Sequence, residues 1–247
     1  MAGLVSGRLV PGLKCANKAH VVKALAVLVL LSLCLALTPE ARAQDRRQNE
    51  PGQFDFYVLS LSWSPSFCAS ANERGRSGRN MQMQCGGSRP YSFVVHGLWP
   101  QYERGFPEYC QRPAPRVSRD VVSMMLDLMP APGLIFNEWD KHGVCSGLSV
   151  RAYFETTRKA RAGVKIPDMF LDLAEAKTVS PNEVEQAFIK ANPGLKEDGI
   201  AVICDRNRLT EVRVCLSKDL GFRSCGDVDR RACRRDAISV PPVRGGI

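Results

Sequence analysis

Two histidines in similar settings are the side chains of this sequence best suited to moving protons. His96 lies in "YSFVVHGLWP" and His142 in "NEWDKHGVC", and each is followed by a glycine and stands three residues from a tryptophan. The chain has 3 histidines, and the third, His20, lies near the N-terminus. Imidazoles titrate at about pH 6.5, so a pair of them can provide one general base and one general acid near neutral pH.

The segment around His142 has the propensity of a helix that ends at Gly143. Glu138, Lys141 and His142 would then share one helix face. For this helix alone, a solvated ion-pair cluster is the simpler interpretation. The other histidine changes the balance, because "SFVV" predicts a strand that ends at His96 and "GLWP" predicts an immediate turn. A buried structural histidine there would not explain why the second one lies beside an acid and a lysine.

The elements that must position these residues mix strands and helices without regular alternation, which predicts an α+β fold. Ser180, Pro181 and Glu183 supply an N-cap, a first-turn proline and a capping-box acid for one helix. "GIAVIC" and "LTEVRVCLS" flank "DRNR" as a hairpin would. Hydrophobic spacing predicts further strands at 54–63 and 91–95 and further helices at 120–128 and 149–162.

The first 43 residues have the pattern of a secretory signal peptide. Basic residues precede an apolar run from Ala24 to Leu37, and the Ala-Arg-Ala sequence at 41–43 offers a cleavage site. A membrane anchor is the alternative, but the run falls short of the roughly 20 apolar residues that span a bilayer. We therefore expect a leader at 1–43 and one catalytic domain at 44–247.

The cysteines predict an oxidising compartment. Of the 10 cysteines, Cys15 and Cys34 lie in the leader, which leaves an even number to pair in the exported chain. Their spacing is not that of a zinc ribbon, so we expect no structural metal. The formal net charge of +9 permits a polyanionic partner. These features predict a periplasmic or secreted protein.

Four segments together resemble a known family. "HGLWP" and "EWDKHGVC" resemble, in order, the two active-site segments of the ribonuclease T2 family of secreted RNA-cleaving enzymes. "FDFYVLSLSWSPSFC" is similar to the family's opening strand, and "LTEVRVCLSKDLGFRSC" to its C-terminal strand with nested cysteines. The resemblance spans residues 54–233. Four motifs in the right order are more specific than any one of them.

The resemblance implies a role for each of four residues. His142 resembles the general base that takes the proton of the ribose 2′-hydroxyl, and His96 the general acid that protonates the leaving 5′-oxygen. Glu138 and Lys141 match the pair that stabilises the negatively charged phosphorane. The implied reaction is endonucleolytic cleavage of single-stranded RNA to 2′,3′-cyclic phosphates, which water later opens. No metal or other cofactor is expected, because RNA carries its own nucleophile.

Substrate binding follows the family pattern only in part. Trp99 and Phe106 resemble the aromatic residues that stack on a base, which suits weak base specificity, although Trp99 could equally belong to the core. Trp139 is assigned to the core. Asn137 stands where the family often has a third, phosphate-binding histidine; it can donate a hydrogen bond but brings no positive charge. Gln101 stands where the family often has aspartate, so no base preference is carried over.

The resemblance also implies disulfides and an overall organisation. It implies a Cys110–Cys145 bond and a Cys215–Cys225 bond nested inside Cys204–Cys233, and Cys68 with Cys85 remains as the fourth pair. We expect a central, mainly antiparallel sheet flanked by helices, in a single domain stapled by disulfides. We expect a monomer whose partner is RNA, with no membrane attachment after cleavage of the leader.

Two other functions fit the same residues. His96, His142 and Glu138 could form a two-histidine, one-carboxylate metal site in a metal-dependent nuclease or hydrolase, although the ammonium of Lys141 would repel a divalent cation. A chelator distinguishes this alternative. The chain could also be a basic, secreted RNA-binding or toxin-like protein without catalysis. A cyclic phosphate product from a dinucleotide would exclude that alternative.

Overall fold

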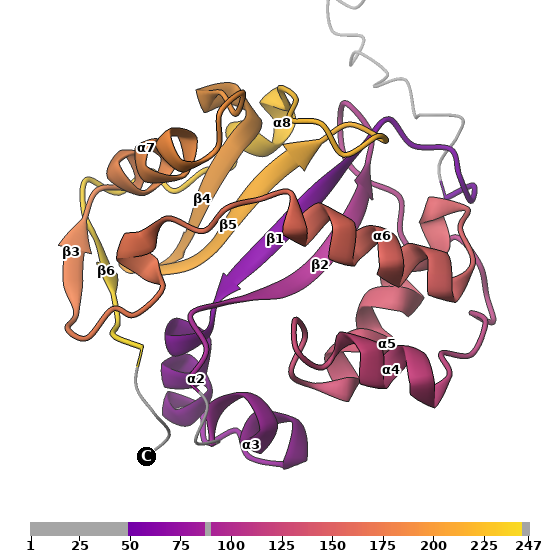
Figure 1. Ribbon diagram of the computed structural model, residues 1–247, viewed down its shortest axis with the longest axis horizontal. Coiled ribbons are helices and arrows are strands. Elements are labelled where there is room, and N and C mark those ends of the chain that lie inside the picture. The colour runs from indigo at the N-terminus through magenta and orange to yellow at the C-terminus, as the bar shows by residue number, and fades with distance from the viewer. Residues whose placement is uncertain (1–48, 87–89, 244–247) are drawn as a thin grey trace, which may run out of the picture. The chain divides into compact units, whose positions relative to one another are not determined.

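A sheet of six strands forms the centre of the molecule (Figure 1). The computed structural model describes residues 49–86 and 90–243, and the predicted leader lies outside them. The strand order is β2-β1-β5-β6-β3, with β4 paired to β5. Every pairing is antiparallel except that of β5 with β6, so the sheet is mixed but mainly antiparallel. The strands are β1 (Phe56–Trp63), β2 (Phe93–Gln101), β3 (Lys177–Val179), β4 (Ile200–Asp205), β5 (Arg208–Leu216) and β6 (Ile238–Val240).

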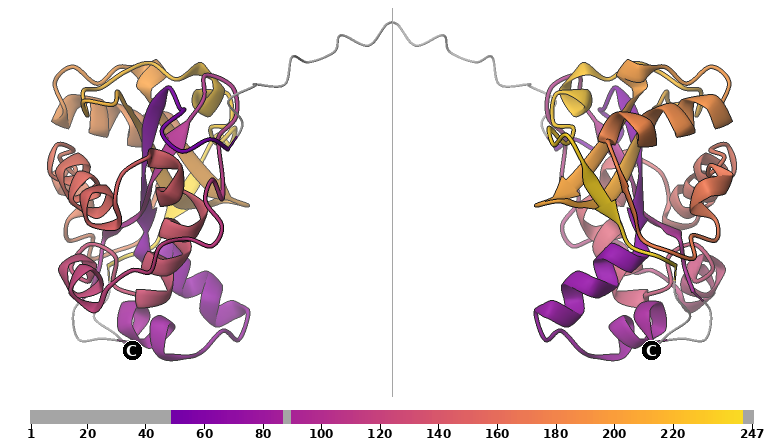
Figure 2. Two further views of the ribbon diagram at one scale, coloured as in Figure 1. Left: turned by 90° about the vertical axis from the view of Figure 1, so that its right-hand side faces the viewer. Right: turned by 90° about the vertical axis from the view of Figure 1, so that its left-hand side faces the viewer.

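Helices surround the sheet, as the predicted α+β class requires. Figures 1 and 2 show α4, α5 and α6 grouped near β1 and β2, α7 beside β4, and α2 with α3 beyond the end of β1. No helix in the described ranges is long and apolar enough to cross a bilayer. The α-helices are α2 (Ser64–Glu73), α3 (Arg79–Cys85), α4 (Arg119–Met125), α5 (Pro132–Lys141), α6 (Val150–Ala162), α7 (Pro181–Ala191) and α8 (Gly226–Asp229). Short 3-10 helices lie at Gly143–Ser146, Asp168–Phe170 and Glu197–Gly199.

Local sequence signals place several of these elements where they were predicted. The capping box of α7 is present: the Ser180 hydroxyl accepts a hydrogen bond from the Glu183 amide at 3.1 Å, and the Glu183 carboxylate accepts one from the Ser180 amide at 2.6 Å. The helix α6 begins after Ser149, whose side chain accepts from the Ala152 amide. The predicted hairpin is the antiparallel pair of β4 and β5.

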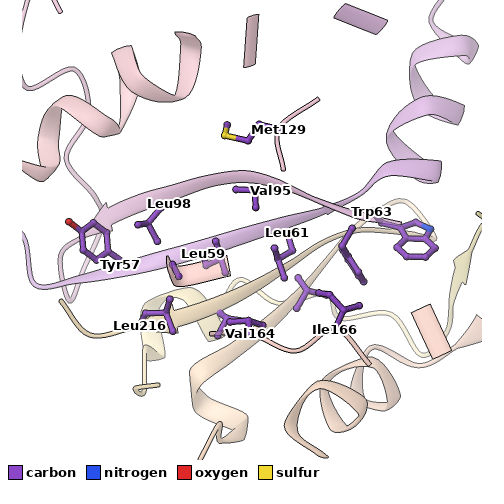
Figure 3. Close-up of a cluster of buried hydrophobic side chains, with 14 of the residues drawn as sticks. Tyr57, Leu59, Leu61, Trp63, Val95, Leu98, Met129, Val164, Ile166 and Leu216 are labelled. Atoms are coloured by element: carbon purple, nitrogen blue, oxygen red, sulfur yellow. The ribbon is translucent and has the colours of Figure 1, made fainter. Parts of the chain in front are cut away.

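Alternate side chains of β1 face the main hydrophobic core. Leu59, Leu61 and Trp63 point into the main hydrophobic cluster and are fully buried (Figure 3). Val95 and Leu98 of β2 join them in the same cluster. Burying one such side chain stabilises a fold by about 1.5–3 kcal/mol. The core therefore fixes β1 and β2 against each other and with them the frame of the site.

A bulge in β2 corrects one expectation about His96. Ser60 of β1 pairs with Gly97 and Leu61 pairs with Val95, so His96 is the extra residue between two regular pairs. The strand then continues to Gln101, and the predicted strand end with an immediate turn at "GLWP" is wrong. Pro100 is tolerated because β2 is an edge strand, where a missing amide donor costs little. A bulge bends the strand and redirects its extra side chain.

Four disulfides tie the loops to this frame, and all four pairings are those expected. Cys110–Cys145 joins the loop after β2 to the 3-10 helix that follows α5. Cys68–Cys85 closes α2 onto α3. The C-terminal part carries Cys215–Cys225 inside Cys204–Cys233.

Candidate active site

The bulge of β2 and the C-terminal end of α5 form the walls of one cavity. The ring of His96 lies 5.2 Å from that of Trp99, and the Trp99 ring lies 5.2 Å from that of His142, the C-cap residue that follows α5. The cavity has a volume of about 240 Å³. Six of the predicted site residues line it: His96, Trp99, Phe106, Glu138, Lys141 and His142.

The glycine after each histidine makes room for a neighbour. A Cβ atom on Gly97 would overlap the carboxylate of Glu138 and the indole of Trp99, so a larger residue there would displace these two side chains of the site. A Cβ atom on Gly143 would overlap the ring of Trp139, which is buried in the core as assigned. The repeated His-Gly pattern is thus a packing requirement on both sides of the site.

His96 lies between two carboxylates. Its Nδ1 atom is 2.6 Å from Oε1 of Glu211 on β5, and its Nε2 atom is 3.5 Å from Oε1 of Glu138. Burial by itself would lower the pKa of His96, but the hydrogen bond with Glu211 and the attraction of both carboxylates outweigh it and raise that pKa. The arrangement favours the protonated imidazolium, which is the form that can donate a proton.

Glu138 is buried inside the site and is not part of a solvated surface cluster. Its side chain points away from solvent, and its Oε2 atom accepts a 2.6 Å hydrogen bond from the Trp99 indole. Burial raises the pKa of Glu138, although His96, Trp99 and Lys141 oppose the shift. The carboxyl therefore holds the indole and faces the imidazole of His96.

His142 has the opposite environment from His96. The residue is 6% exposed, and its Nδ1 atom is buried with no hydrogen-bond partner among the described residues. Burial, and then repulsion by Lys141, His96 and Arg213, lowers the pKa of His142 to about 3. The imidazole is therefore neutral over most of the pH range, and a neutral imidazole can accept a proton.

The remaining predicted residues of this cavity form its rim. The Lys141 ammonium is 3.6 Å from the Glu108 carboxylate and 6.0 Å from the centre of the Phe106 ring. Phe106 is 38% exposed, and its ring lies 6.1 Å from that of His142, so one aromatic surface is open beside this imidazole. The Trp99 ring is only partly buried, and the Arg213 guanidinium lies 5.0 Å from its centre.

Comparison with known proteins shows where this arrangement belongs. The model of the ribonuclease T2 family matches residues 54–225. The chain is 34% identical over 200 residues to a ribonuclease of Aeromonas hydrophila, and the alignment covers 78% of this chain and 85% of that relative. The chain belongs to the ribonuclease T2 family. It is also 28% identical over 228 residues to ribonuclease I of Escherichia coli, with 77% of this chain and 85% of the relative covered.

Solved structures of the family share the fold. An RNase-related protein from Calystegia sepium superimposes with a TM-score of 0.62 at 19% identity, over 77% of this chain and 98% of that one. RNase NT, solved in complex with 5′-AMP, has a TM-score of 0.58 at 23% identity, over 77% of this chain and 99% of that one. The α+β fold predicted from the mixture of strand and helix patterns in the sequence is thus confirmed.

Two positions of this T2 chain stand apart from the expected pattern. Asn137 is exposed and does not line the cavity of the two histidines; it lines a second cavity that also borders His96. Its contact with the scissile phosphate stays a prediction. Gln101 does line the first cavity, but its amide donates to the Pro100 carbonyl at 2.9 Å, so one of its two N–H donors is already used.

Sequence reasoning missed two residues of this T2 site. Glu211 bonds His96, and Arg213 donates to the second oxygen of Glu211 at 2.9 and 2.7 Å from its Nε and one terminal nitrogen. Burial would raise the pKa of Glu211, but these partners lower it to about 2, so it remains a carboxylate. The sequence offers only a weak signal: the two charged residues of "LTEVRVC" stand at alternate positions of a predicted strand and so would share one face, which does not by itself indicate what they contact.

Proposed function

We propose that His142 is the general base and His96 the general acid of RNA cleavage by this chain. Membership of the T2 family makes the chain a metal-independent endoribonuclease. The observation that carries the proposal is a pair of opposite pKa shifts within one cavity. The pKa of His142 is lowered to about 3, and the pKa of His96 is raised. Environments that push two pKa values apart assign the acid and the base of a site.

In the first step the neutral imidazole of His142 removes the proton of the ribose 2′-hydroxyl. The 2′-oxygen attacks the adjacent phosphorus, and the bond to the 5′-oxygen breaks as His96 donates its proton to that oxygen. The products are a 2′,3′-cyclic phosphate and a free 5′-hydroxyl. In the second step water opens the cyclic phosphate with the two histidines in exchanged roles.

The residues around the histidines stabilise the charged phosphorane and bind the substrate. The Lys141 ammonium lies at the rim, where attraction stabilises the extra negative charge of the phosphorane. The Glu138 carboxylate lies 3.5 Å from Nε2 of His96 and attracts its imidazolium, so it assists formation of the phosphorane by keeping the proposed acid protonated. The exposed ring of Phe106 offers a stacking surface to any base, so base specificity is weak.

The setting proposed for the enzyme is the periplasm or the exterior of the cell. All the cysteines in the described part of the chain are paired in disulfides, which persist in oxidising compartments. The leader proposed at 1–43 would supply the export signal, and 44–247 would be the mature domain. We also propose that the enzyme acts as a monomer.

Treatment with EDTA tests the proposal against its two rivals. The purified protein, incubated in EDTA with a single-stranded RNA, should release 2′,3′-cyclic phosphate ends and leave the matching DNA intact, because DNA lacks the 2′-hydroxyl. Loss of activity in EDTA and recovery with a divalent ion would support the metal-site alternative. Binding of RNA without any cyclic product would support a binding protein.

A further inference from the structure

A second cavity of about 540 Å³ borders His96. His96 is the one residue, among those described, that lines both this cavity and the cavity of the two histidines. The floor of the second cavity includes Ser62 of β1 and Val94 of β2, and Asn137 of α5 lies at its wall. The two cavities therefore meet at the proposed general acid.

The second cavity has a built frame. One wall is α2 and α3, which the Cys68–Cys85 bond holds together. The beginning of α5 also lines the cavity, and it is joined to α3 where the Asn80 side-chain oxygen accepts a hydrogen bond from the Gly133 amide at 3.4 Å. The Gln84 amide, also at the lining, donates to the Ser64 hydroxyl at 3.1 Å.

The charge of this cavity is positive. Arg76 and Arg79 line it, and no acidic residue in the described part of the chain does. Neither arginine forms an ion pair with a described residue, whereas the nearby Arg74 lies 3.8 Å from the Asp205 carboxylate. Exposed arginines on a turn are common, so the informative fact is their place in a cavity that ends at His96.

We propose that Arg76 and Arg79 bind the phosphate that follows the leaving nucleoside. The inference rests on the proposed function: if His142 takes the 2′-proton in the first cavity, the nucleoside whose 5′-oxygen His96 protonates must leave on the other side of His96. The second cavity is the other cavity that borders His96, so the 3′-phosphate of that nucleoside would face the arginines that line it. A guanidinium suits this task because its paired donors match two phosphate oxygens.

The test compares a dinucleoside monophosphate with the same molecule carrying a 3′-terminal phosphate. The wild type should cleave the phosphorylated substrate with about tenfold higher kcat/KM, mainly through KM, a factor that corresponds to about 1.4 kcal/mol. The double variant Arg76→Gln, Arg79→Gln should lose this preference and cleave the shorter substrate at the wild-type rate. Arg74→Gln, the matched control, should keep the preference.

A binding titration with the 2′-deoxy forms of both molecules makes the same comparison without chemistry. The wild type should bind the phosphorylated form about tenfold more tightly at low salt, and the double variant should bind both forms equally. Equal affinity in the wild type, or a preference that survives in the double variant, would overturn the inference. Failure of the proposed function is a separate result, because an exchange of the two histidine roles would leave the affinities of these uncleavable molecules unchanged and would appear only in the cleavage rates of the His96 and His142 variants.

Discussion

At the scale of single residues, the surroundings of the two histidines shift their pKa values in opposite directions. His142 lies among aromatic rings and cations, which disfavour its protonated form, and His96 lies between two carboxylates, which favour it. Replacing either with alanine should lower kcat on a dinucleotide by at least about 10²-fold to 10⁴-fold, the usual effect of losing a general acid or base. The double variant should be little worse than either single one, since groups that act as a unit are not additive. Near-normal turnover in His142→Ala would exclude it as the base.

We expect Glu211 to act as a positioning residue that holds His96 and raises its pKa. In Glu211→Gln the attraction that raises the pKa of His96 is weakened while its burial remains, so that pKa should fall. A general acid works only while protonated, and activity is lost as pH rises through its pKa. The high-pH limb of kcat/KM for a dinucleotide should therefore move to lower pH.

The matched control is Glu155→Gln, a change on the exposed ion pair of α6 with Arg151. It should leave both limbs of the profile in place. A uniform loss of rate in Glu211→Gln at every pH, with an unmoved high-pH limb, would mean that Glu211 is only structural.

At the scale of elements, the site depends on the close approach of α5 to β2. Gly97→Ala would place a Cβ atom against the Glu138 carboxylate and force it, or α5, to shift. A displacement of this order can cost about 10²-fold in rate. The expected result is a large drop in kcat in a protein that remains folded, with only a modest fall in its melting temperature. Gly163→Ala is the control, since a Cβ atom there makes only ordinary contacts, and unchanged kcat in Gly97→Ala would contradict this account.

The sequence predicted the elements that depend on neighbouring residues, and it did not predict the contacts between residues far apart in the chain. The capping box at Ser180 and the hairpin of β4 and β5 depend on adjacent residues, so the sequence alone predicts them. The bulge at His96 depends on its register with β1, which no local pattern encodes. Glu211 was missed for the same reason, because its partner lies 115 residues away in the chain. The residue types of the site were predictable, whereas the contacts that set their pKa values were not.

At the scale of the whole molecule, the disulfides hold separate segments in place around the sheet. Removing Cys110–Cys145 by alanine substitution opens a loop with a sequence separation of 35, for which chain entropy predicts a loss of about 4 kcal/mol of unfolding free energy. Because this bond lies next to the end of α5, kcat should also fall, even well below the melting temperature.

Removing Cys68–Cys85 provides the comparison. Its sequence separation is 17, so chain entropy predicts a smaller loss, about 3 kcal/mol. It closes α2 onto α3, which line the second cavity and not the cavity of the two histidines, so kcat on a dinucleoside monophosphate should fall less than in the Cys110–Cys145 variant. Equal loss of kcat in both variants, measured at a temperature where both are folded, would show that the Cys110 bond has no special role in the site.

The assignment of acid and base is tested most directly by a dinucleotide with sulfur in place of the leaving 5′-oxygen. A thiol has a pKa of about 8.5, far below that of an alcohol, so the thiolate leaves without being protonated. His96→Ala should cleave this substrate at close to the wild-type rate, while His142→Ala should stay impaired because the 2′-hydroxyl still needs a base. Rescue of His142→Ala with continued failure of His96→Ala would contradict the account and exchange the two roles.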